Sequence, residues 1–164
     1  MRSAVIAGGQ ARRFNGRPKG LEKIAGKRIL DRVVDALAEA TGELPTLIAN
    51  APDANSWRKD LEVVADAVPH CGSLGGIYTA IVSGDGPVIV VAWDMPFVPA
   101  TLLRKLAAGS GAHDVFLPAS GGPRGVEPLC GVYGPACAEP VRRQLDAEDY
   151  RAIGFHEHVN VGCL

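Results

Sequence analysis

The sequence lacks several features that would place a protein in a specialised class. It has no run of about 18 apolar residues, so we expect no membrane-spanning helix. We also expect no signal peptide, because the first apolar run leads directly into a glycine pair. The four cysteines are widely spaced and form no Cys-x-x-Cys pair, which argues against a disulfide or zinc framework and favours reduced thiols in the cytoplasm. Repeats and low-complexity segments are absent, so one domain, 1–164, is expected.

Net charge is close to zero overall, but positive charge is concentrated near the start of the chain. The formal net charge is -1, yet residues 1–30 contain eight lysines and arginines against a single acidic residue, Glu22. This concentration is too local for a broad nucleic-acid face, and it fits a small polyanion held at one loop. For Lys23, Lys27 and Arg28, which lie beyond that loop, the alternative is the solvated basic start of a helix.

The first apolar run ends in the glycine pair Gly8–Gly9, and basic residues follow within the same loop. Without side chains at these two positions, a ligand can approach the main-chain N–H groups closely. Arg13, Lys19 and two further arginines supply positive charge of the kind that holds phosphate oxygens. We interpret the loop as a triphosphate-binding site; the alternative is a glycine-rich turn followed by solvated arginines.

The spacing of this loop matches neither of the two commonest glycine-rich signatures. A P-loop requires a serine or threonine after its lysine, whereas Lys19 is followed by Gly20 and Leu21. The dinucleotide fingerprint requires Gly-x-Gly-x-x-Gly, and the adjacent glycines break that spacing.

Strand-like and helix-like segments alternate along the chain. After a strand at 4–7, the expected strands are 45–50, 62–65, 87–92, 114–118, 129–133 and 156–161, and the expected helices are 28–41, 57–61, 74–82, 100–108 and 135–146. Ser73 is a candidate cap for the third of these helices. The uninterrupted apolar run at 87–92 is typical of a central strand buried on both faces. This alternation predicts an α/β fold with a doubly wound, mostly parallel sheet and helices on both faces.

Polar residues follow several of the predicted strands. Ligands of doubly wound sheets bind at the carboxyl ends of the strands, which places Gly8, Asn50, Asp66 and Asp94 along one rim. Asn50 can both donate and accept hydrogen bonds, which suits recognition of a base or ribose. The helix start at Gly72 offers N–H donors to an anion or a base edge. The alternatives are ordinary, since Asp66 can cap a turn and Asn50 can simply end its strand.

Asp94 directly follows the most apolar strand. A carboxylate there is costly unless something positive meets it. Nucleotidyl transfer needs a hard cation that bridges phosphate oxygens, and Mg²⁺ is usually held by one or two carboxylates with phosphates and waters. Asp94 is therefore our candidate ligand of Mg²⁺, and the alternative is a turn cap before Pro96.

These motifs together resemble those of the molybdenum cofactor guanylyltransferases, a branch of the nucleotidyltransferase superfamily. The family signature Leu-Ala-Gly-Gly-x-x-x-Arg-Met-Gly-x-x-Lys is similar to residues 6–19, and Gly-Leu follows the lysine as it does in family members. Residues 94–99 resemble the family's Asp-x-Pro-Phe/Tyr-Leu/Ile-Pro, and residues 72–76 its Gly-Pro-Leu-Ala-Gly. The resemblance covers residues 3–135 well and implies a single-domain, three-layer, Rossmann-like fold of the nucleotide-diphospho-sugar transferase type.

The resemblance also implies roles for individual residues. The nucleotide would be bound by Ile6, Ala7, Gly8, Gly9, Arg13, Lys19, Asn50, Asp66, Gly72 and Asp94. Within this set, the catalytic group would consist of Arg13, Lys19 and Asp94. Arg13 would neutralise charge in the transition state, Lys19 would reach the phosphates, and Asp94 would hold Mg²⁺.

The last part of the chain resembles the family less closely. Glu127 and the following Pro-Leu fit a family segment near the second substrate, and the preceding glycine-rich loop carries Arg124, which would meet that substrate's phosphate or else be solvated. Family members usually end with Asn-x-Asn-Thr-Pro-x-Asp/Glu-Leu and a helix that helps to bind the pterin. Here only Asn160 resembles this motif, so we expect a protein that is naturally short or cut before the motif, and we expect His156 and His158 to lie at the surface.

The resemblance predicts transfer of GMP from GTP to the phosphate of molybdenum-molybdopterin, with pyrophosphate as the second product. The alternatives are a CTP-dependent molybdopterin cytidylyltransferase, which tends to have Lys-Leu-Leu at this lysine, and a sugar-phosphate nucleotidylyltransferase, which is usually longer. A non-catalytic relative that binds nucleotide is a third alternative. The expected partners are molybdenum-insertion and molybdoenzyme maturation proteins, without nucleic acid or membrane, and the expected assembly is a monomer or weak homo-oligomer.

Overall fold

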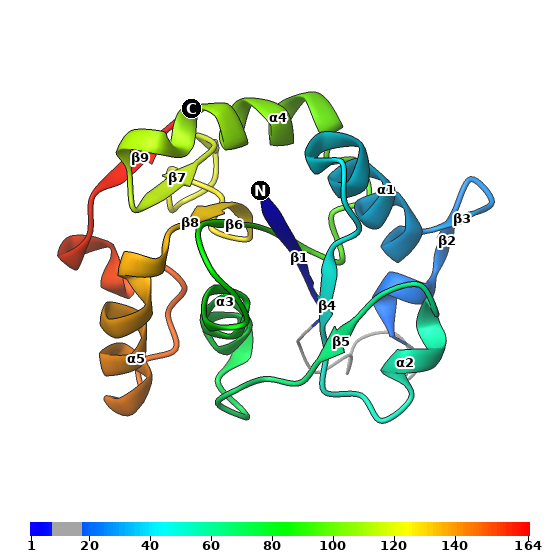
Figure 1. Ribbon diagram of the computed structural model, residues 1–164, viewed down its shortest axis with the longest axis horizontal. Helices are drawn as coiled ribbons and strands as arrows, with labels where there is room; N and C mark the ends of the chain where they lie inside the picture. Colours follow the sequence, from blue (N-terminus) through cyan, green and yellow to red (C-terminus); the bar gives the residue numbers. More distant parts are fainter. Residues whose placement is uncertain (8–17) are drawn as a thin grey trace.

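The computed structural model describes residues 1–7 and 18–164, and within them seven strands form one sheet (Figure 1). In chain order these strands are β1 (Arg2–Ile6), β4 (Thr46–Ile48), β5 (Val63–Val64), β6 (Val88–Ala92), β7 (Val115–Leu117), β8 (Cys130–Tyr133) and β9 (Val161–Cys163). Their order across the sheet is β5-β4-β1-β6-β8-β7-β9. All neighbours are parallel except β8, which runs antiparallel to both β6 and β7.

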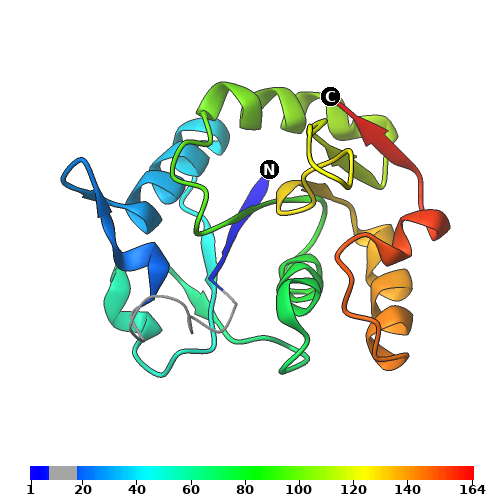
Figure 2. The same cartoon turned by 180° about the vertical axis from the view of Figure 1, so that it is seen from behind.

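Helices cover both faces of this sheet (Figures 1 and 2). One face carries α1 (Ile29–Thr41) and α4 (Ala100–Gly109), and the other carries α3 (Gly72–Val82) and α5 (Ala138–Asp146). Short helical segments fill the connections, namely η1 (Lys19–Leu21), α2 (Ala54–Trp57), η2 (Ser110–Ala112), η3 (Pro135–Cys137) and η4 (Gly154–His158). This arrangement confirms the predicted three-layer, mostly parallel α/β fold. None of the described helices is long and apolar enough to cross a membrane.

Strand β6 lies at the centre of the sheet and is buried on both faces, as its sequence predicts. Ile89 and Val91 belong to the core under α1 and α4, whereas Val88 and Val90 belong to the core under α3 and α5. Successive side chains of a strand point to opposite faces, so alternate residues of this run pack into the two different cores. Each such side chain contributes roughly 1.5–3 kcal/mol when fully buried, which makes β6 the best anchored strand of the sheet.

Two short predicted elements differ in the structure. The helix expected at 57–61 lies earlier, at Ala54–Trp57, because Trp57 turns its ring into the core and ends the helix. The helix predicted to begin at 74 begins at Gly72 with φ +60°, and no side chain caps it, so the expected role of Ser73 as a cap is wrong.

The strand predicted at 156–161 is also wrong. Residues 154–158 form η4, and β9 follows only at Val161. The apparent alternation comes from Val159 and Val161, two apolar residues separated by one polar residue. Val159 packs against the core under α3 and α5, whereas Val161 is exposed, so the two do not form one buried face of a strand.

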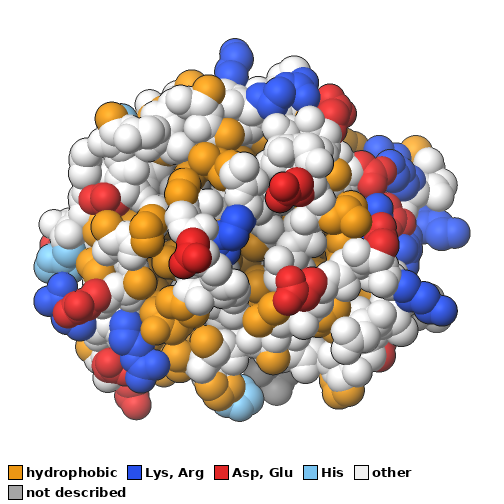
Figure 3. Space-filling view, in the orientation of Figure 1, with side chains coloured by type: hydrophobic (Ala, Val, Ile, Leu, Met, Phe, Trp, Pro, Cys, Tyr) orange, Lys and Arg blue, Asp and Glu red, His pale blue; other side chains and the backbone are white. Residues whose placement is uncertain are grey.

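The basic residues after η1 form a hairpin rather than the start of a helix. Strands β2 (Lys23–Ile24) and β3 (Lys27–Arg28) pair across Ala25 and Gly26, which both have positive φ as a two-residue hairpin turn requires. Arg28 donates two hydrogen bonds to Asp31, at 2.7 and 2.9 Å. Figure 3 shows basic and acidic side chains interspersed along this edge, so the positive charge of the hairpin is offset locally.

Candidate active site

Three of the predicted site residues lie at one edge of the sheet. Asn50 comes after β4, Asp66 after β5, and Asp94 after β6. The parallel register places Ile6 opposite both Ile48 and Ala92, so these strands end at the same level. The structure therefore brings Asn50, Asp66 and Asp94 to the end of β1, where the predicted phosphate loop begins. Gly8, Gly9 and Arg13 lie outside the described residues.

Asn50 and Asp66 are joined by two hydrogen bonds. The Asn50 amide Nδ2 donates to Asp66 Oδ2 at 2.7 Å, and Asn50 Oδ1 accepts from the Asp66 backbone N–H at 2.8 Å. The pair fixes the orientation of both side chains and links the loops after two neighbouring strands. Asp66 Oδ1 is left as the oxygen that can accept a hydrogen bond from a hydroxyl or amino group of a ligand.

The start of α3 packs closely behind this pair because Gly75 and Gly76 have no side chains. A Cβ at Gly76 would lie 2.7 Å from Ile6 Cγ2, and a Cβ at Gly75 would lie 3.0 Å from Cys71 Cβ and 3.9 Å from Asp66 Oδ2. The Ala67 N–H donates to Thr79 Oγ1 at 2.9 Å, which ties the loop after Asp66 to the same helix. Gly72, a predicted nucleotide-binding residue, is the first residue of α3 and directly follows this loop.

The backbone on both sides of Asp94 is held in place while its side chain is exposed. The Trp93 N–H donates to the Ile6 carbonyl at 3.1 Å, and the Met95 N–H donates to the Ala92 carbonyl at 3.3 Å. Within the described ranges, no group of three or more His, Cys, Asp or Glu side chains lies close enough together to hold a metal ion. A cation at Asp94 would therefore complete its shell with oxygens of phosphates and water, as Mg²⁺ commonly does.

Lys19 begins η1, a short turn that packs against Trp93. The Leu21 N–H donates to the Pro18 carbonyl at 3.0 Å, and the Glu22 N–H donates to the Lys19 carbonyl at 3.1 Å. Gly20 is buried against the indole of Trp93, the residue immediately before Asp94. The predicted phosphate-binding lysine therefore belongs to a turn that packs on the residue before the predicted metal ligand.

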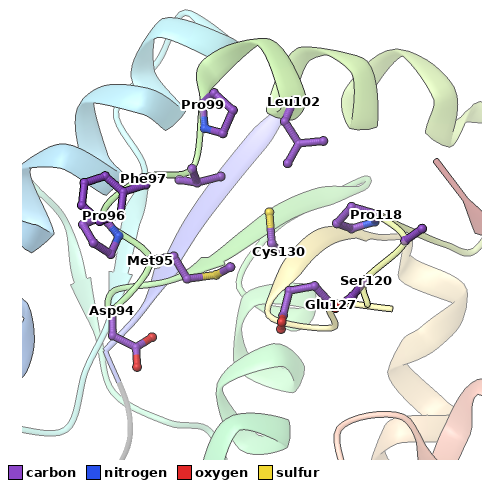
Figure 4. A pocket seen from close by; sticks show the side chains of 12 residues that line it. Asp94, Met95, Pro96, Phe97, Pro99, Leu102, Pro118, Ser120, Glu127 and Cys130 are labelled. Atoms are coloured by element: carbon purple, nitrogen blue, oxygen red, sulfur yellow. The ribbon is translucent and has the colours of Figure 1, made fainter. Parts of the chain in front are cut away.

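A cavity of about 500 Å³ lies on the other side of Asp94 (Figure 4). Its walls come from the turn after β6, the start of α4, the loop after β7 and the start of β8, and they consist of Asp94, Met95, Pro96, Phe97, Val98, Pro99, Leu102, Pro118, Ala119, Ser120, Glu127 and Cys130. The lining is mostly apolar, and Figure 4 shows the carboxyl groups of Asp94 and Glu127 at the end away from Leu102.

Glu127 and Cys130 set the chemistry of this cavity. Glu127 Oε1 accepts a hydrogen bond from the Leu129 N–H at 3.2 Å. This bond fixes the carboxylate at the end of the cavity away from Leu102, where the Asp94 carboxyl group also lies (Figure 4); we call this end the cavity mouth. Burial, and then the negative charge of Glu127, raise the pKa of the Cys130 thiol to about 12, so this side chain stays neutral. Sequence reasoning noted Glu127 by position but missed Cys130, Met95 and Leu102. No local pattern could have identified these residues, because β8 lies beside β6 only through the order of strands in the sheet.

Neither of the two residues predicted for the second substrate lines this cavity. Arg124 is exposed in the loop that Ser120 begins, and Ser120 lines the cavity although Arg124 does not. Asn160 lies before β9 at the opposite edge of the sheet from Asp94. Its backbone N–H donates to Asp114 Oδ2 at 2.9 Å and its Nδ2 donates to the Ala112 carbonyl at 2.8 Å. These bonds tie the segment before β9 to the segment before β7. Asn160 therefore does not lie at the edge of the sheet that carries Asn50, Asp66 and Asp94.

Comparison with known proteins supports the predicted family. The family described as "MobA-like NTP transferase domain" matches residues 3–160. A probable molybdenum cofactor guanylyltransferase from Pelotomaculum thermopropionicum is 32% identical over 161 residues, which is 98% of this chain and 76% of that protein.

Solved structures show the same fold. The crystal structure of molybdopterin-guanine dinucleotide biosynthesis protein A from Archaeoglobus fulgidus superposes with a TM-score of 0.80 at 25% identity, over 100% of this chain and 83% of that one. A Mycobacterium tuberculosis protein whose structure is a complex with manganese, Rv0371C, is similar in fold alone, with a TM-score of 0.65 at 17% identity over 99% and 86% of the two chains. The resemblance inferred from the motifs is confirmed: the chain belongs to the MobA-like NTP transferase family, whose members include molybdenum cofactor guanylyltransferases.

Proposed function

We propose that this protein transfers GMP from GTP to the phosphate of molybdenum-molybdopterin and releases pyrophosphate. The observation that carries the proposal is the position of Asp94 between two different surroundings. On one side lie the Asn50–Asp66 pair, the start of α3 and Lys19, and on the other lies the apolar cavity. The polar side suits a nucleoside triphosphate, and the cavity suits a flat ring system such as a pterin.

The reaction requires no covalent intermediate with the protein. An oxygen of the pterin's phosphate attacks the α-phosphorus of GTP in line, a new P–O bond forms, and the bond from the α-phosphorus to the bridging oxygen breaks so that pyrophosphate leaves. The contribution of the protein is to orient the two substrates and to neutralise charge on the phosphates. In this proposal Lys19 binds the phosphates and the Asn50–Asp66 pair orients the base or ribose. Arg13 neutralises charge in the transition state.

The residues at the cavity mouth fit a bound Mg²⁺ ion. Asp94 and Glu127 are the charged side chains of the lining, and neither has a basic neighbour among the other lining residues. Two carboxylates repel an incoming phosphate. A divalent cation on Asp94 would offset this repulsion and stabilise charge on the reacting phosphates. A protein of the same fold has been solved as a complex with manganese.

Within this proposal the described chain acts as one nucleotidyltransferase domain, with α4 and the 118–127 segment forming the side that receives the pterin. Arg124 is close enough in sequence to Ser120 to reach a phosphate at the mouth, and this role stays a prediction. Transfer of the finished cofactor to molybdenum-insertion or molybdoenzyme maturation proteins is part of the proposal as well. Within residues 1–7 and 18–164, no side chain is assigned to selecting guanine over cytosine, so the base is tested directly.

The test measures pyrophosphate release with Mg²⁺, molybdopterin and each of the four nucleoside triphosphates. Release with GTP alone is expected. Asp94→Asn should lower the rate by about 100-fold, or about 3 kcal/mol, as loss of a key electrostatic group does. Asp85→Asn is the matched control, because Asp85 is exposed just before β6 whereas Asp94 follows it.

Other outcomes would redirect the proposal. Release with CTP alone would keep the site and the mechanism but would identify a cytidylyltransferase. Measurable GTP binding with no release for any triphosphate would contradict the enzyme proposal and would support a non-catalytic, nucleotide-binding relative. Equal losses in the two aspartate variants would remove the metal-binding role from Asp94.

A further inference from the structure

The closest packing around Lys19 is between its neighbour Gly20 and the indole ring of Trp93. A Cβ at position 20 would lie 2.2, 2.6 and 2.9 Å from Trp93 Cε3, Cδ2 and Cζ3. These distances are far below van der Waals contact, so glycine is the residue that lets the turn lie flat against the ring. The two residues that touch are the immediate sequence neighbours of Lys19 and of Asp94.

The Trp93 ring is itself held firmly. It is buried, and it stacks on Trp57 with ring centroids 5.2 Å apart and an interplanar angle of 20°. Trp57 in turn donates from Nε1 to Asp53 Oδ2 at 3.1 Å, and its carbonyl accepts from Arg28 Nη1 at 2.7 Å. With its backbone N–H bonded to the Ile6 carbonyl, Trp93 is fixed both to β1 and to this stack.

Among the described residues, backbone hydrogen bonds of the turn that bears Lys19 run within the turn and to α1, where the Glu22 carbonyl accepts from the Ile29 N–H at 2.9 Å. The turn meets the residues after β6 where Gly20 packs on Trp93. Leu21 packs against the same core, which contains Trp93. Packing of Gly20 on the Trp93 ring therefore contributes directly to how the turn lies against the end of β6.

We propose that Trp93 is a positioning residue that fixes Lys19 relative to Asp94 through its contact with Gly20. This inference rests on the proposed function, in which Lys19 holds phosphates and Asp94 holds the metal ion on the same triphosphate. A displacement of about 1 Å between two such groups is enough to cost about 100-fold in rate. The Trp57–Trp93 stack thus serves the reaction without touching the substrates.

The contact is tested by Gly20→Ala, with Gly111→Ala as the matched control. Gly111 lies in η2, and a Cβ added there has nothing within 4 Å. Gly20→Ala should lower kcat/KM for GTP by about 100-fold and raise the Mg²⁺ concentration needed for half-maximal rate. The control should stay within about twofold of wild type. Thermal unfolding of both variants shows whether either loses stability.

A second substitution separates positioning from a general loss of folding. Trp93→Phe replaces the indole with a smaller ring, so Gly20→Ala combined with Trp93→Phe should recover at least about tenfold of the activity lost by Gly20→Ala alone. Recovery supports the proposal. Gly20→Ala activity equal to that of the control, or a loss that follows the unfolding temperature and is not recovered in the double variant, would overturn it.

Measuring GTP affinity as well as rate separates a failure of this positioning role from a failure of the proposed function. If wild type releases no pyrophosphate, the proposed function fails, and the affinity for GTP with Mg²⁺ becomes the measure. A weaker affinity in Gly20→Ala that Trp93→Phe restores would still support the positioning role. An unchanged affinity would reject it.

Discussion

The two halves of the sheet end in rims of different chemistry. In the half formed by β5, β4, β1 and β6, the strands are parallel, and polar side chains gather where they end, among them the hydrogen-bonded Asn50 and Asp66. In the half formed by β8, β7 and β9, the antiparallel β8 interrupts the pattern, and the same edge carries an apolar cavity. Asp94 follows β6, the last strand before the reversal.

This difference shows how one sheet can receive two unlike substrates. Parallel strands place each strand-to-helix loop at the same edge, where backbone donors and short polar side chains meet a charged ligand. The reversed strand instead begins at that edge, so its first residue, Cys130, faces the cavity and brings an apolar wall. Asp94 lies between the two regions, where the proposed reaction would transfer the nucleotidyl group from one substrate to the other.

The largest effect is expected from a substitution that fills the apolar cavity, because it tests whether the two sides of Asp94 bind different ligands. Ala119 lines the cavity and is exposed, so Ala119→Trp can place a bulky ring in it without overpacking the core. We expect kcat/KM for the pterin substrate to fall by about 100-fold, because the bound ring system would be displaced from its reacting position. The affinity for GTP, measured by equilibrium binding, should not change.

Ala108→Trp is the control for this substitution, because Ala108 is exposed on α4 away from the cavity lining. An equal loss in both variants, or an equal loss of GTP affinity in Ala119→Trp, would show that the two sides of Asp94 are not separate binding regions.

The polar side can be tested through the pair that joins β4 and β5. Asn50→Ala and Asp66→Ala should each raise KM for GTP about tenfold, because each leaves its partner without a hydrogen bond worth roughly 1–3 kcal/mol. Together the two substitutions should cost clearly less than the sum of the single effects, as expected for residues that act as a unit. Strictly additive effects on KM in this double-mutant cycle would mean that the pair does not act as a unit.

A smaller effect is expected at the opposite edge of the sheet. Asn160→Ala removes the hydrogen bond to the Ala112 carbonyl and should lower the free energy of unfolding by about 1 kcal/mol. The rate of pyrophosphate release at a temperature well below unfolding should match wild type. A large fall in that rate with unchanged stability would instead support the substrate-binding role that the family resemblance implies for Asn160.

The smallest effect concerns pH and the segment before β9. Burial lowers the pKa of His156 below its usual 6.5, and the ring packs edge-on against Phe155. The unfolded chain therefore binds a proton that the folded chain resists, so this residue lowers the free energy of unfolding as pH falls below 6.5. Urea unfolding between about pH 7.5 and 5.5 should show a shallower decline for His156→Gln than for wild type.

His158→Gln is the comparison for that measurement, because His158 is exposed in the same segment. If the two variants decline with equal slopes, the buried ring of His156 is not the source of the pH dependence.

Local sequence patterns were sufficient for the central layers and for much of the polar rim. The β-branched run at β6 and the helical spacing of Leu30, Val33 and Leu37 are decided by burial within a few neighbouring residues, so they can be recognised without a structure. Asn50, Asp66 and Asp94 were placed by a rule of topology, since each follows a strand of the parallel half.

The features that were missed depend on contacts between distant segments. The fit of Gly20 against Trp93 joins residues more than seventy positions apart, and neither residue signals the other in the sequence. The cavity likewise forms from the turn after β6, the start of α4 and the loop after β7. The hairpin at Lys23–Arg28 and the short helical segment Gly154–His158 were misread because two- to five-residue elements carry too few positions for a periodic pattern.

The stack of Trp57 on Trp93 has an optical consequence. The sequence contains two tryptophans, and both are in this stack, so the protein's tryptophan fluorescence arises from a single place, one residue before Asp94. Emission from two rings in contact is sensitive to small changes in their separation and surroundings. An unlabelled sample should therefore report the arrival of a nucleotide and its metal ion as a change in emission, whereas a ligand confined to the far edge of the sheet should leave the spectrum as it was.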